Sequence, residues 1–213
     1  MFVKQFPIGG DRNFGYLAVD ENTGAAFVVD PSYAPEIITE FAGKKDYEIK
    51  YAFCTHDHYD HTSGNNVFKR LTGIAPLLFG EVESSSGIKI GDNTKLPLGN
   101  LEVTIMHTPG HTSDCICIYA DDAVFTGDTL FVGKVGGTDY GDQAKAEYDS
   151  LHNKLMKLPG STRVFPGHDY GTAPESTIEN ELRTNPFLLR PNLSSFIDLK
   201  INWLEYKREH GIE

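Results

Sequence analysis

The chain has 213 residues, 39% of them hydrophobic and 23% charged, a length that suits one well-buried core better than two. Nineteen basic against thirty acidic residues give a formal net charge of -11, which opposes nonspecific binding to nucleic acid or to an anionic membrane. Because the charges are mixed along the chain rather than blocked, a disordered or low-complexity protein is excluded.

Cysteine content and the absence of targeting signals restrict the class further. The three cysteines, Cys54, Cys115 and Cys117, are too few for a disulfide framework. The first residues lack a charged segment followed by an apolar one, and no apolar run approaches the ~20 residues needed to cross a bilayer. We therefore expect a cytoplasmic protein without a membrane partner.

The first third of the chain predicts strands separated by Gly, Asn and Asp turns. The expected strands cover residues 2–6, 14–20, 25–30 and 49–54. A short helix between Pro35 and Gly43 precedes the fourth strand. Thr62 is expected to be the N-cap of the next helix.

The remainder of the chain mixes further strands with helices. The expected strands cover residues 75–79, 101–107, 114–119, 123–126 and 163–165, with a hairpin region over 87–99. A helix from about residue 144 to 158 is stopped by Pro159 and Gly160. After Pro174 we expect two helical pieces with a break over 185–191. Since many strands come in consecutive runs, the pattern favours helices outside mixed sheets, which is an α/β architecture.

Five of the eight histidines lie where the chain leaves an expected strand for a turn. Three of them belong to the phrase THDHYDH over residues 55–61, and the others follow in TPGHTSD and FPGHDYG. A further aspartate stands in FTGDTLF. The histidines and aspartates that share this context are His56, His58, Asp60, His61, His111, Asp128 and His168.

Their spacing is suited to metal binding. Residues two apart on an extended segment point the same way, ~6.5 Å apart, so loop curvature can bring His56 and His58 onto one ion. Asp60 and His61, at the turn into the next helix, can face a second ion, and Asp128 is the natural bridging carboxylate. Imidazole nitrogen and carboxylate oxygen suit zinc, iron or manganese. A lone loop histidine is more often a surface residue, so the prediction depends on the whole set.

Together these phrases resemble the metallo-β-lactamase superfamily over roughly residues 1–172. The resemblance implies a four-layer αβ/βα sandwich with the metal site at one edge, between two β-sheets. We therefore expect a single domain over residues 1–213, with a helical C-terminal extension over 173–213 whose apolar residues pack on the domain itself. By position, the resemblance implies a first metal held by His56, His58 and His111 and a second held by Asp60, His61 and His168, with Asp128 between them.

PGHT, FTGDTLF, PGHDYG and STIENELRTNPF resemble the hydroxyacylglutathione hydrolase (glyoxalase II) and persulfide dioxygenase branches. The first branch implies hydrolysis of a thioester such as an acylglutathione by metal-bound hydroxide. The site would hold two divalent ions, for which zinc is the expected metal and iron or manganese are the alternatives. Asp60 and Asp128 are then the catalytic residues, and Cys54 is a core residue rather than a nucleophile. The alternative is a mononuclear iron persulfide dioxygenase whose triad would be His56, His111 and Asp128.

The choice between the branches depends on residues around the ligands. Thr138–Asp139–Tyr140 and the HDY phrase favour the dioxygenase, whereas the complete set of seven ligands favours the hydrolase. Both branches usually place Lys or Arg in a G-C-G-K/R phrase that helps bind glutathione, but Gly137 stands at that position here. Lys134 is the expected substitute. Tyr170 is a second expected substrate contact by resemblance, with a packing role as the alternative.

The expected partner is therefore a small-molecule thioester or thiol-derived compound. Nucleic-acid processing occurs in the same superfamily, but the net charge of -11 and the lack of a basic arm disfavour it. The sequence leaves the oligomeric state open.

Overall fold

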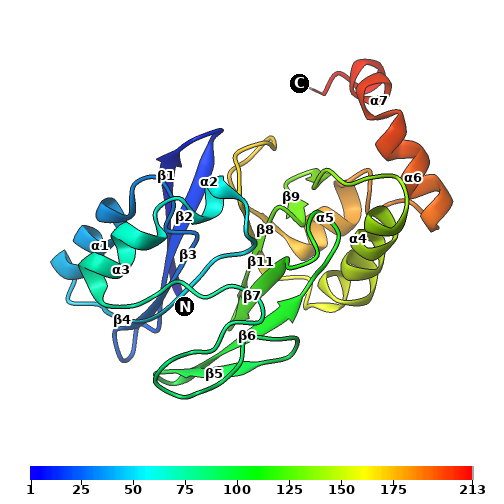
Figure 1. The fold of residues 1–213 in the computed structure, drawn as a ribbon. Coiled ribbons are helices and arrows are strands. Elements are labelled where there is room, and N and C mark those ends of the chain that lie inside the picture. The colour runs from blue at the N-terminus through cyan, green and yellow to red at the C-terminus, as the bar shows by residue number, and fades with distance from the viewer. Residues whose placement is uncertain (213) are drawn as a thin grey trace.

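The computed structural model of the protein, which describes residues 1–212, places two β-sheets face to face with helices outside both (Figure 1). Helices of the N-terminal half cover the first sheet, and helices of the C-terminal half cover the second. This order of helix, sheet, sheet and helix confirms the predicted α/β sandwich.

The first sheet contains the four strands that the N-terminal sequence predicts. They are β1 (Phe2–Gly9), β2 (Asn13–Val19), β3 (Ala25–Val29) and β4 (Glu48–Phe53). The first three pair in antiparallel fashion, whereas β3 and β4 are parallel. The parallel pair requires a crossover, which the helix α1 (Pro35–Lys44) supplies.

The second sheet has six strands in the order β12-β11-β8-β7-β6-β5. Their bounds are β5 (Lys95–Leu98), β6 (Leu101–His107), β7 (Ile116–Ala120), β8 (Ala123–Gly127), β11 (Arg163–Pro166) and β12 (Ser176–Thr177). A separate ladder joins β9 (Leu130–Phe131) to β10 (Lys134–Val135). The hairpin expected over 87–99 lies further along the chain, because β5 pairs with β6.

Within residues 1–212, seven further helical segments follow α1. They are α2 (Tyr59–Thr62), α3 (Asn65–Thr72), α4 (Asp142–Asn153), a 3₁₀ turn (Leu155–Lys157), α5 (Ile178–Thr184), α6 (Leu193–Ile201) and α7 (Trp203–His210). The helix expected over 144–158 is thus divided at Lys154, whose backbone is not helical (φ -122°, ψ -70°). Its side chain is bound elsewhere, since its ammonium donates to Asp92 Oδ1 (2.7 Å) and to the His107 carbonyl (2.6 Å).

Three hydrophobic clusters fill the three spaces between the layers. In the central space, Phe27 of β3 meets Phe125 of β8 edge to face, with ring centroids 5.5 Å apart. Ile38 and Phe68 fill the space under α1 and α3, and Leu155 and Phe196 belong to the cluster beside the second sheet. Because β2 and β3 are covered on both faces, all their residues are buried.

The predicted N-cap at Thr62 is wrong. Thr62 is the last residue of α2, and its hydroxyl donates to the His58 carbonyl (3.0 Å). The next helix begins only at Asn65, after Gly64, where a Cβ would stand 2.0 Å from the Pro31 carbonyl oxygen. This close contact between segments distant in sequence decides where the helix begins.

The strand expected over 75–79 is reduced to a single bridge between Leu77 and Phe53. Leu77 accepts from the Cys54 amide (2.9 Å) and donates to the Ala52 carbonyl (2.8 Å). Pro76 precedes it and has no N–H, so the ladder cannot continue in that direction.

The C-terminal helices begin and break as expected, with an additional interruption at Asn202 between α6 and α7. Ile178 of α5 and Leu199 of α6 are buried in one cluster with Val164 of β11. Because residues on both sides of position 172 share this cluster, we propose that the chain is one domain. The last residue of the predicted extension, Glu213, lies outside the described residues. α7 projects from the body (Figure 1), and its residues are exposed or half-buried.

Within residues 1–212, the structure contains no helix whose length and apolar character would allow it to cross a membrane.

Candidate metal centre

The seven predicted ligands lie together at one edge of the sandwich, where strands of both sheets end. The first sheet delivers four of them directly after β4: His56, His58, Asp60 and His61. The second sheet delivers three from the segments after β6, β8 and β11: His111, Asp128 and His168. Short motifs far apart in sequence therefore converge because the strands that carry them end at the same edge.

One group consists of His56, His58 and His111. The Nε2 atom of His56 lies 2.9 Å from Nδ1 of His58, and Nε2 of His111 lies 3.1 Å from the same Nδ1. The three ligand atoms fall within 4.8 Å of one another. This spacing is close enough for all three imidazoles to face one ion.

A second group consists of Asp60, His61 and His168. The Nε2 atoms of His61 and His168 are 3.3 Å apart, and Nε2 of His168 lies 3.3 Å from Oδ2 of Asp60. The three ligand atoms again lie within 4.8 Å of one another. The arrangement offers a second set of two nitrogens and one oxygen beside the first.

Asp128 lies between the two groups. Its Oδ1 is 3.3 Å from Nε2 of His61 and 3.4 Å from Nε2 of His168, while its Oδ2 is 3.6 Å from Nε2 of His111. Within residues 1–212, Oδ1 is buried and has no hydrogen-bond partner. A buried carboxylate oxygen without a donor is costly, so this atom is best explained by a cation.

Glycine makes room for this carboxylate. A Cβ on Gly167, in the FPGHDYG phrase, would stand 2.6 Å from Asp128 Oδ1. In the FTGDTLF phrase, Gly127 has φ +47°, and a Cβ there would lie 2.5 Å from the Thr55 hydroxyl. The glycines of both phrases are therefore required by close approach at the site.

Three of the histidines direct one ring nitrogen to a protein acceptor and the other to the centre. An acceptor at the outer nitrogen places the proton there and leaves the inner lone pair free for a metal. The contacts are His61 Nδ1 to Asp30 Oδ2 (2.9 Å), His168 Nδ1 to the Asp11 carbonyl (2.8 Å) and His111 Nδ1 to the Gly137 carbonyl (2.7 Å).

Asp30 and Asn13 are supporting residues that the sequence analysis missed. Asp30 also accepts from the amide (2.7 Å) and hydroxyl (2.9 Å) of Thr55, and it has φ +49°, uncommon for a residue other than glycine. Asn13 donates from Nδ2 to Asp60 Oδ2 (3.1 Å). The only signal in the sequence is the carboxylate that ends the strand over 25–30.

The electrostatics of the centre favour a cation. Burial and the neighbouring His61 lower the pKa of His56 to about 2, so this imidazole is neutral. Burial alone would lower the pKa of His61, but Asp30 and Asp128 outweigh it and raise the pKa well above its usual value. Burial acts to raise the pKa of Asp128, yet the close contact with His61 and the charges of the surrounding histidines hold that pKa below the usual range.

The donor set fits divalent metal ions. It consists of imidazole nitrogens and carboxylate oxygens, which zinc, iron and manganese accept. Cysteine does not contribute: burial raises the pKa of the Cys54 thiol well above its usual value and those of Cys115 and Cys117 to about 12 and about 11. Cys54 is fully buried, as expected for a core residue.

Tyr170 and Lys134, the two expected substrate contacts, lie next to the second group. The Tyr170 ring stacks on His168 with centroids 4.5 Å apart, and its hydroxyl donates to Asp11 Oδ2 (2.6 Å). The Lys134 ammonium and the Arg12 guanidinium each lie 4.9 Å from the centre of the Tyr170 ring. A cavity of about 230 Å³ extends from Lys134 past Gly137.

Comparison with known proteins identifies the family. The family model described as the metallo-beta-lactamase superfamily matches residues 9–87 and 80–168. The chain belongs to this superfamily. The match includes the whole run of seven residues, from His56 to His168, that meet at the edge of the sandwich.

Relatives and solved structures show which members of the metallo-beta-lactamase superfamily this chain is similar to. The chain is 32% identical to the probable hydroxyacylglutathione hydrolase glo2 of Schizosaccharomyces pombe, over 89% of this chain and 74% of that protein. It is 34% identical to the cytoplasmic hydroxyacylglutathione hydrolase of Arabidopsis thaliana, over 83% of each. The crystal structure of ETHE1 from Myxococcus xanthus aligns with a TM-score of 0.84 at 30% identity, covering 95% of this chain and 91% of that one. These matches confirm the predicted superfamily, its fold and the hydrolase class of enzyme.

Proposed function

We propose that this protein hydrolyses the thioester of a small thiol with two divalent metal ions. The observation that carries the proposal is Asp128, a buried carboxylate between two three-ligand groups, with an oxygen that lacks a donor within residues 1–212. One ion would serve only one of the groups, whereas two ions use both. The named hydroxyacylglutathione hydrolases among the relatives support a thioester as the substrate class.

His56, His58 and His111 would hold the first ion, and Asp60, His61 and His168 the second, with Asp128 bound to both. Two such ions supply Lewis acidity toward the thioester carbonyl and lower the pKa of a water molecule toward neutrality. Zinc is the metal we propose, with iron or manganese as the alternatives that the same donors accept.

Two carboxylates are the proposed catalytic residues. Asp128 is held in place by its close contacts with His61 and His168, and Asp60 is held by the Asn13 amide (3.1 Å). Asp60 is the more exposed, with 32% of its side-chain surface accessible against 12% for Asp128. We therefore assign Asp60 to accept a hydrogen bond from the attacking water and orient it toward the carbonyl.

Lys134 and Tyr170 are the proposed substrate-binding residues. Burial and the neighbouring Lys207 lower the pKa of the Lys134 ammonium. Among residues 1–212, no carboxylate lies within ion-pair distance of it. An unpaired, half-buried cation beside the centre suits a carboxylate on the thiol part of the substrate. The space that a side chain at Gly137 would take is open, so Lys134 faces no competing side chain there.

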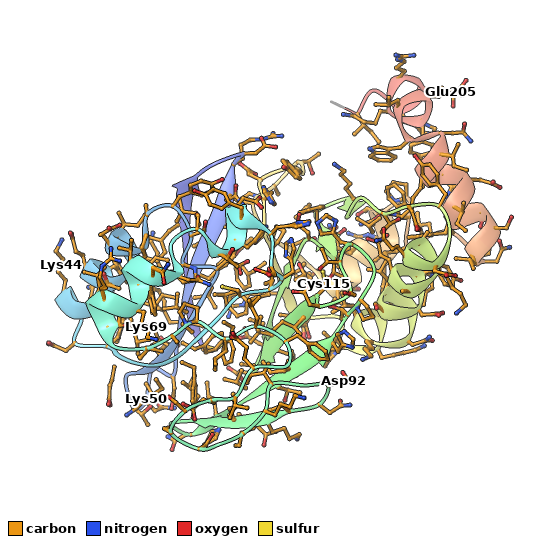
Figure 2. All side chains as sticks on the ribbon, viewed as in Figure 1. Lys44, Lys50, Lys69, Asp92, Cys115 and Glu205 are labelled. Atoms are coloured by element: carbon orange, nitrogen blue, oxygen red, sulfur yellow. The ribbon has the colours of Figure 1, made fainter. Side chains whose placement is uncertain are left out.

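Lys134→Met is expected to raise KM about 10-fold or more for an acylglutathione, because a charge-assisted hydrogen bond contributes roughly 1.5–3 kcal/mol. kcat should change little. Steady-state kinetics on an acylglutathione and on an acyl thioester of uncharged 2-mercaptoethanol check this. The matched control is Lys69→Met on α3, which covers the first sheet at the left of Figure 2. Equal changes in KM for both substrates would show that Lys134 does not bind the carboxylate of the glutathione part.

A mononuclear iron persulfide dioxygenase is the second candidate, and the close fit to ETHE1 favours it. Its triad of His56, His111 and Asp128 would leave Asp60, His61 and His168 without a role. A complete second group of ligands is the reason to prefer the hydrolase.

Zinc- or manganese-loaded protein is expected to cleave an acylglutathione under anaerobic conditions, because the attacking group comes from water rather than from oxygen. Release of free thiol, measured with and without oxygen, checks the rate, and metal-stripped protein is the control. Persulfide-dependent oxygen uptake by iron-loaded protein, with no thioesterase activity under any metal, would replace the hydrolase by its rival. Cytoplasmic location and the absence of nucleic-acid and membrane partners stay predictions.

A further inference from the structure

His111 is a ligand that depends on a neighbouring turn for its orientation. Its side chain is 16% exposed, against 1% for His61 and 2% for His168. Its Nδ1 donates to the Gly137 carbonyl at 2.7 Å. The position of that carbonyl therefore decides how the imidazole is turned and which nitrogen faces the centre.

Helix α4 holds the turn that carries His111. A Cβ on Gly110 would lie 2.4 Å from Cβ of Glu147 and 2.8 Å from its amide nitrogen, so the turn packs directly on the helix. The hydroxyl of Ser150 donates to the Pro109 carbonyl at 2.8 Å. The backbone before His111 is thus fixed from one side.

The carbonyl of Gly137 follows a buried glycine in a segment that is packed on one side only. A Cβ on Gly136 would lie 2.0 Å from the Asp128 carbonyl oxygen, whereas one on Gly137 would have no atom within 4 Å. Glycine at both positions allows a wide range of backbone angles, so contacts decide where the Gly137 carbonyl lies. The adjacent carbonyl, that of Gly136, accepts from the Lys200 ammonium of α6 at 2.6 Å. Lys200 is therefore a side-chain donor that holds this segment beside α4.

The same ammonium lies 2.6 Å from Oε2 of Glu147, so one cation joins α6, α4 and the Gly136 peptide. The side chains of Lys200 and Glu147 are 6% and 0% exposed. Burying two charges is expensive, and an apolar pair of similar volume often stabilises a fold as well or better. The apolar residues Phe196 and Leu199 already pack α6 on the domain. Stability alone therefore gives little reason for this pair.

We propose that Lys200 and Glu147 are positioning residues, which anchor the Gly136 carbonyl and thereby place the next carbonyl, that of Gly137, which orients His111. Glu147 forms an ion pair with the ammonium, the ammonium donates to the Gly136 carbonyl, and the next carbonyl, that of Gly137, accepts from the imidazole. The C-terminal extension then takes part in building the metal centre rather than only packing against the core. This inference rests on the proposed function, because it assigns His111 to the first metal.

The test uses the double variant Glu147→Leu/Lys200→Met, which removes both charges and keeps similar volumes, so that no buried charge is left unpaired. Cobalt(II) is titrated into metal-free protein and followed by its visible absorption, with thermal unfolding as the measure of folding. We expect an unfolding midpoint close to that of the parent and a 10- to 100-fold weaker affinity for one of the two ions, as for other lost outer partners of ligands. The spectrum of that ion should also change.

Two single variants complete the design. Lys200→Arg keeps a donor that reaches the Gly136 carbonyl and should restore most of the affinity, whereas Lys200→Gln is shorter and should not. This pair also tests the proposal if the double variant does not fold. The matched control is Lys145→Met, which removes a lysine of α4 from an exposed pair with Asp149 (2.5 Å) and should leave both ions unchanged.

The outcomes separate this inference from the proposed function. If the parent binds two ions and the double variant binds both with the same affinity and spectrum, the positioning role is wrong and the hydrolase proposal stands. Equal affinities for Lys200→Arg and Lys200→Gln would also overturn it. If the parent binds fewer than two ions, the dinuclear proposal fails and this inference fails with it.

Discussion

His111→Ala is expected to remove one of two bound metal ions and to lower kcat/KM by more than about 100-fold, the upper end of what loss of an outer hydrogen-bond partner of a ligand costs. Asp60→Ala should remove mainly the other ion, because Asp60 belongs to the second group and His111 to the first. Both changes should cost far more activity than stability, since each side chain is partly exposed. Metal analysis of purified protein, paired with thioesterase kinetics, measures both effects.

His107→Ala is the matched control for this pair. His107 is the last residue of β6, four positions before His111, and its ring stacks on Phe79 with centroids 4.0 Å apart. It lies outside both ligand groups, so its loss should leave metal content and turnover unchanged. Should Asp60→Ala retain two ions and full turnover, the dinuclear centre would be refuted.

Asp30→Ala is expected to lower the free energy of unfolding by roughly 3–6 kcal/mol, because three buried donors lose their acceptor and each unpaired donor costs ~1–3 kcal/mol, part of which relaxation recovers. The donors are the amide and hydroxyl of Thr55 and Nδ1 of His61, at 2.7, 2.9 and 2.9 Å. The second ion should also bind 10- to 100-fold more weakly, since nothing then fixes the tautomer of His61. Denaturant unfolding and metal titration measure the two effects separately.

Asp30→Asn separates stability from metal binding. An asparagine tolerates the left-handed backbone at this position (φ +49°) and still offers one oxygen to Thr55. Its amide group, however, would face His61 as a donor. We therefore expect a small loss of stability with a large loss of affinity for the second ion.

Asp20→Ala is the matched control for the stability effect. Asp20 is also buried and accepts from Asn22 (3.0 Å), Thr23 (2.8 Å) and Asn100 (2.8 Å), but it lies outside the ligand groups. It should also lose stability, because its donors lose their acceptor, but with unchanged metal binding. Unaltered affinity of the second ion in both variants at Asp30 would mean that this carboxylate serves folding alone.

The ligand set could be predicted from the sequence because its information is local. H-x-H-x-D-H fixes four side chains within one short segment, and the later GH, GD and GH phrases each follow a strand. Strands carry a strong local signal in their alternation and their turn residues. Once two sheets face each other, the strand ends that carry these phrases meet at one edge, as observed for all seven residues.

Supporting residues could not be predicted, because each acts on a partner distant in the chain. Asp30 and His61 are 31 positions apart, and Asn13 and His168 are 155 positions apart. In the sequence, Lys200 is indistinguishable from any other polar residue of an amphipathic helix. Only the packing of α6 beside α4 brings it to Glu147. No periodicity in the sequence encodes such pairs.

Local signals also failed where a tertiary contact overrode them. Thr62 has the chemistry of an N-cap, but the approach of Gly64 to the Pro31 carbonyl delays the next helix to Asn65. The sequence by itself therefore determined the sheets, the family and the atoms available to bind metal. Only the tertiary structure decided how those atoms are oriented, because hydrogen bonds to Asp30, to Asp11 and to the Gly137 carbonyl set the ring nitrogens.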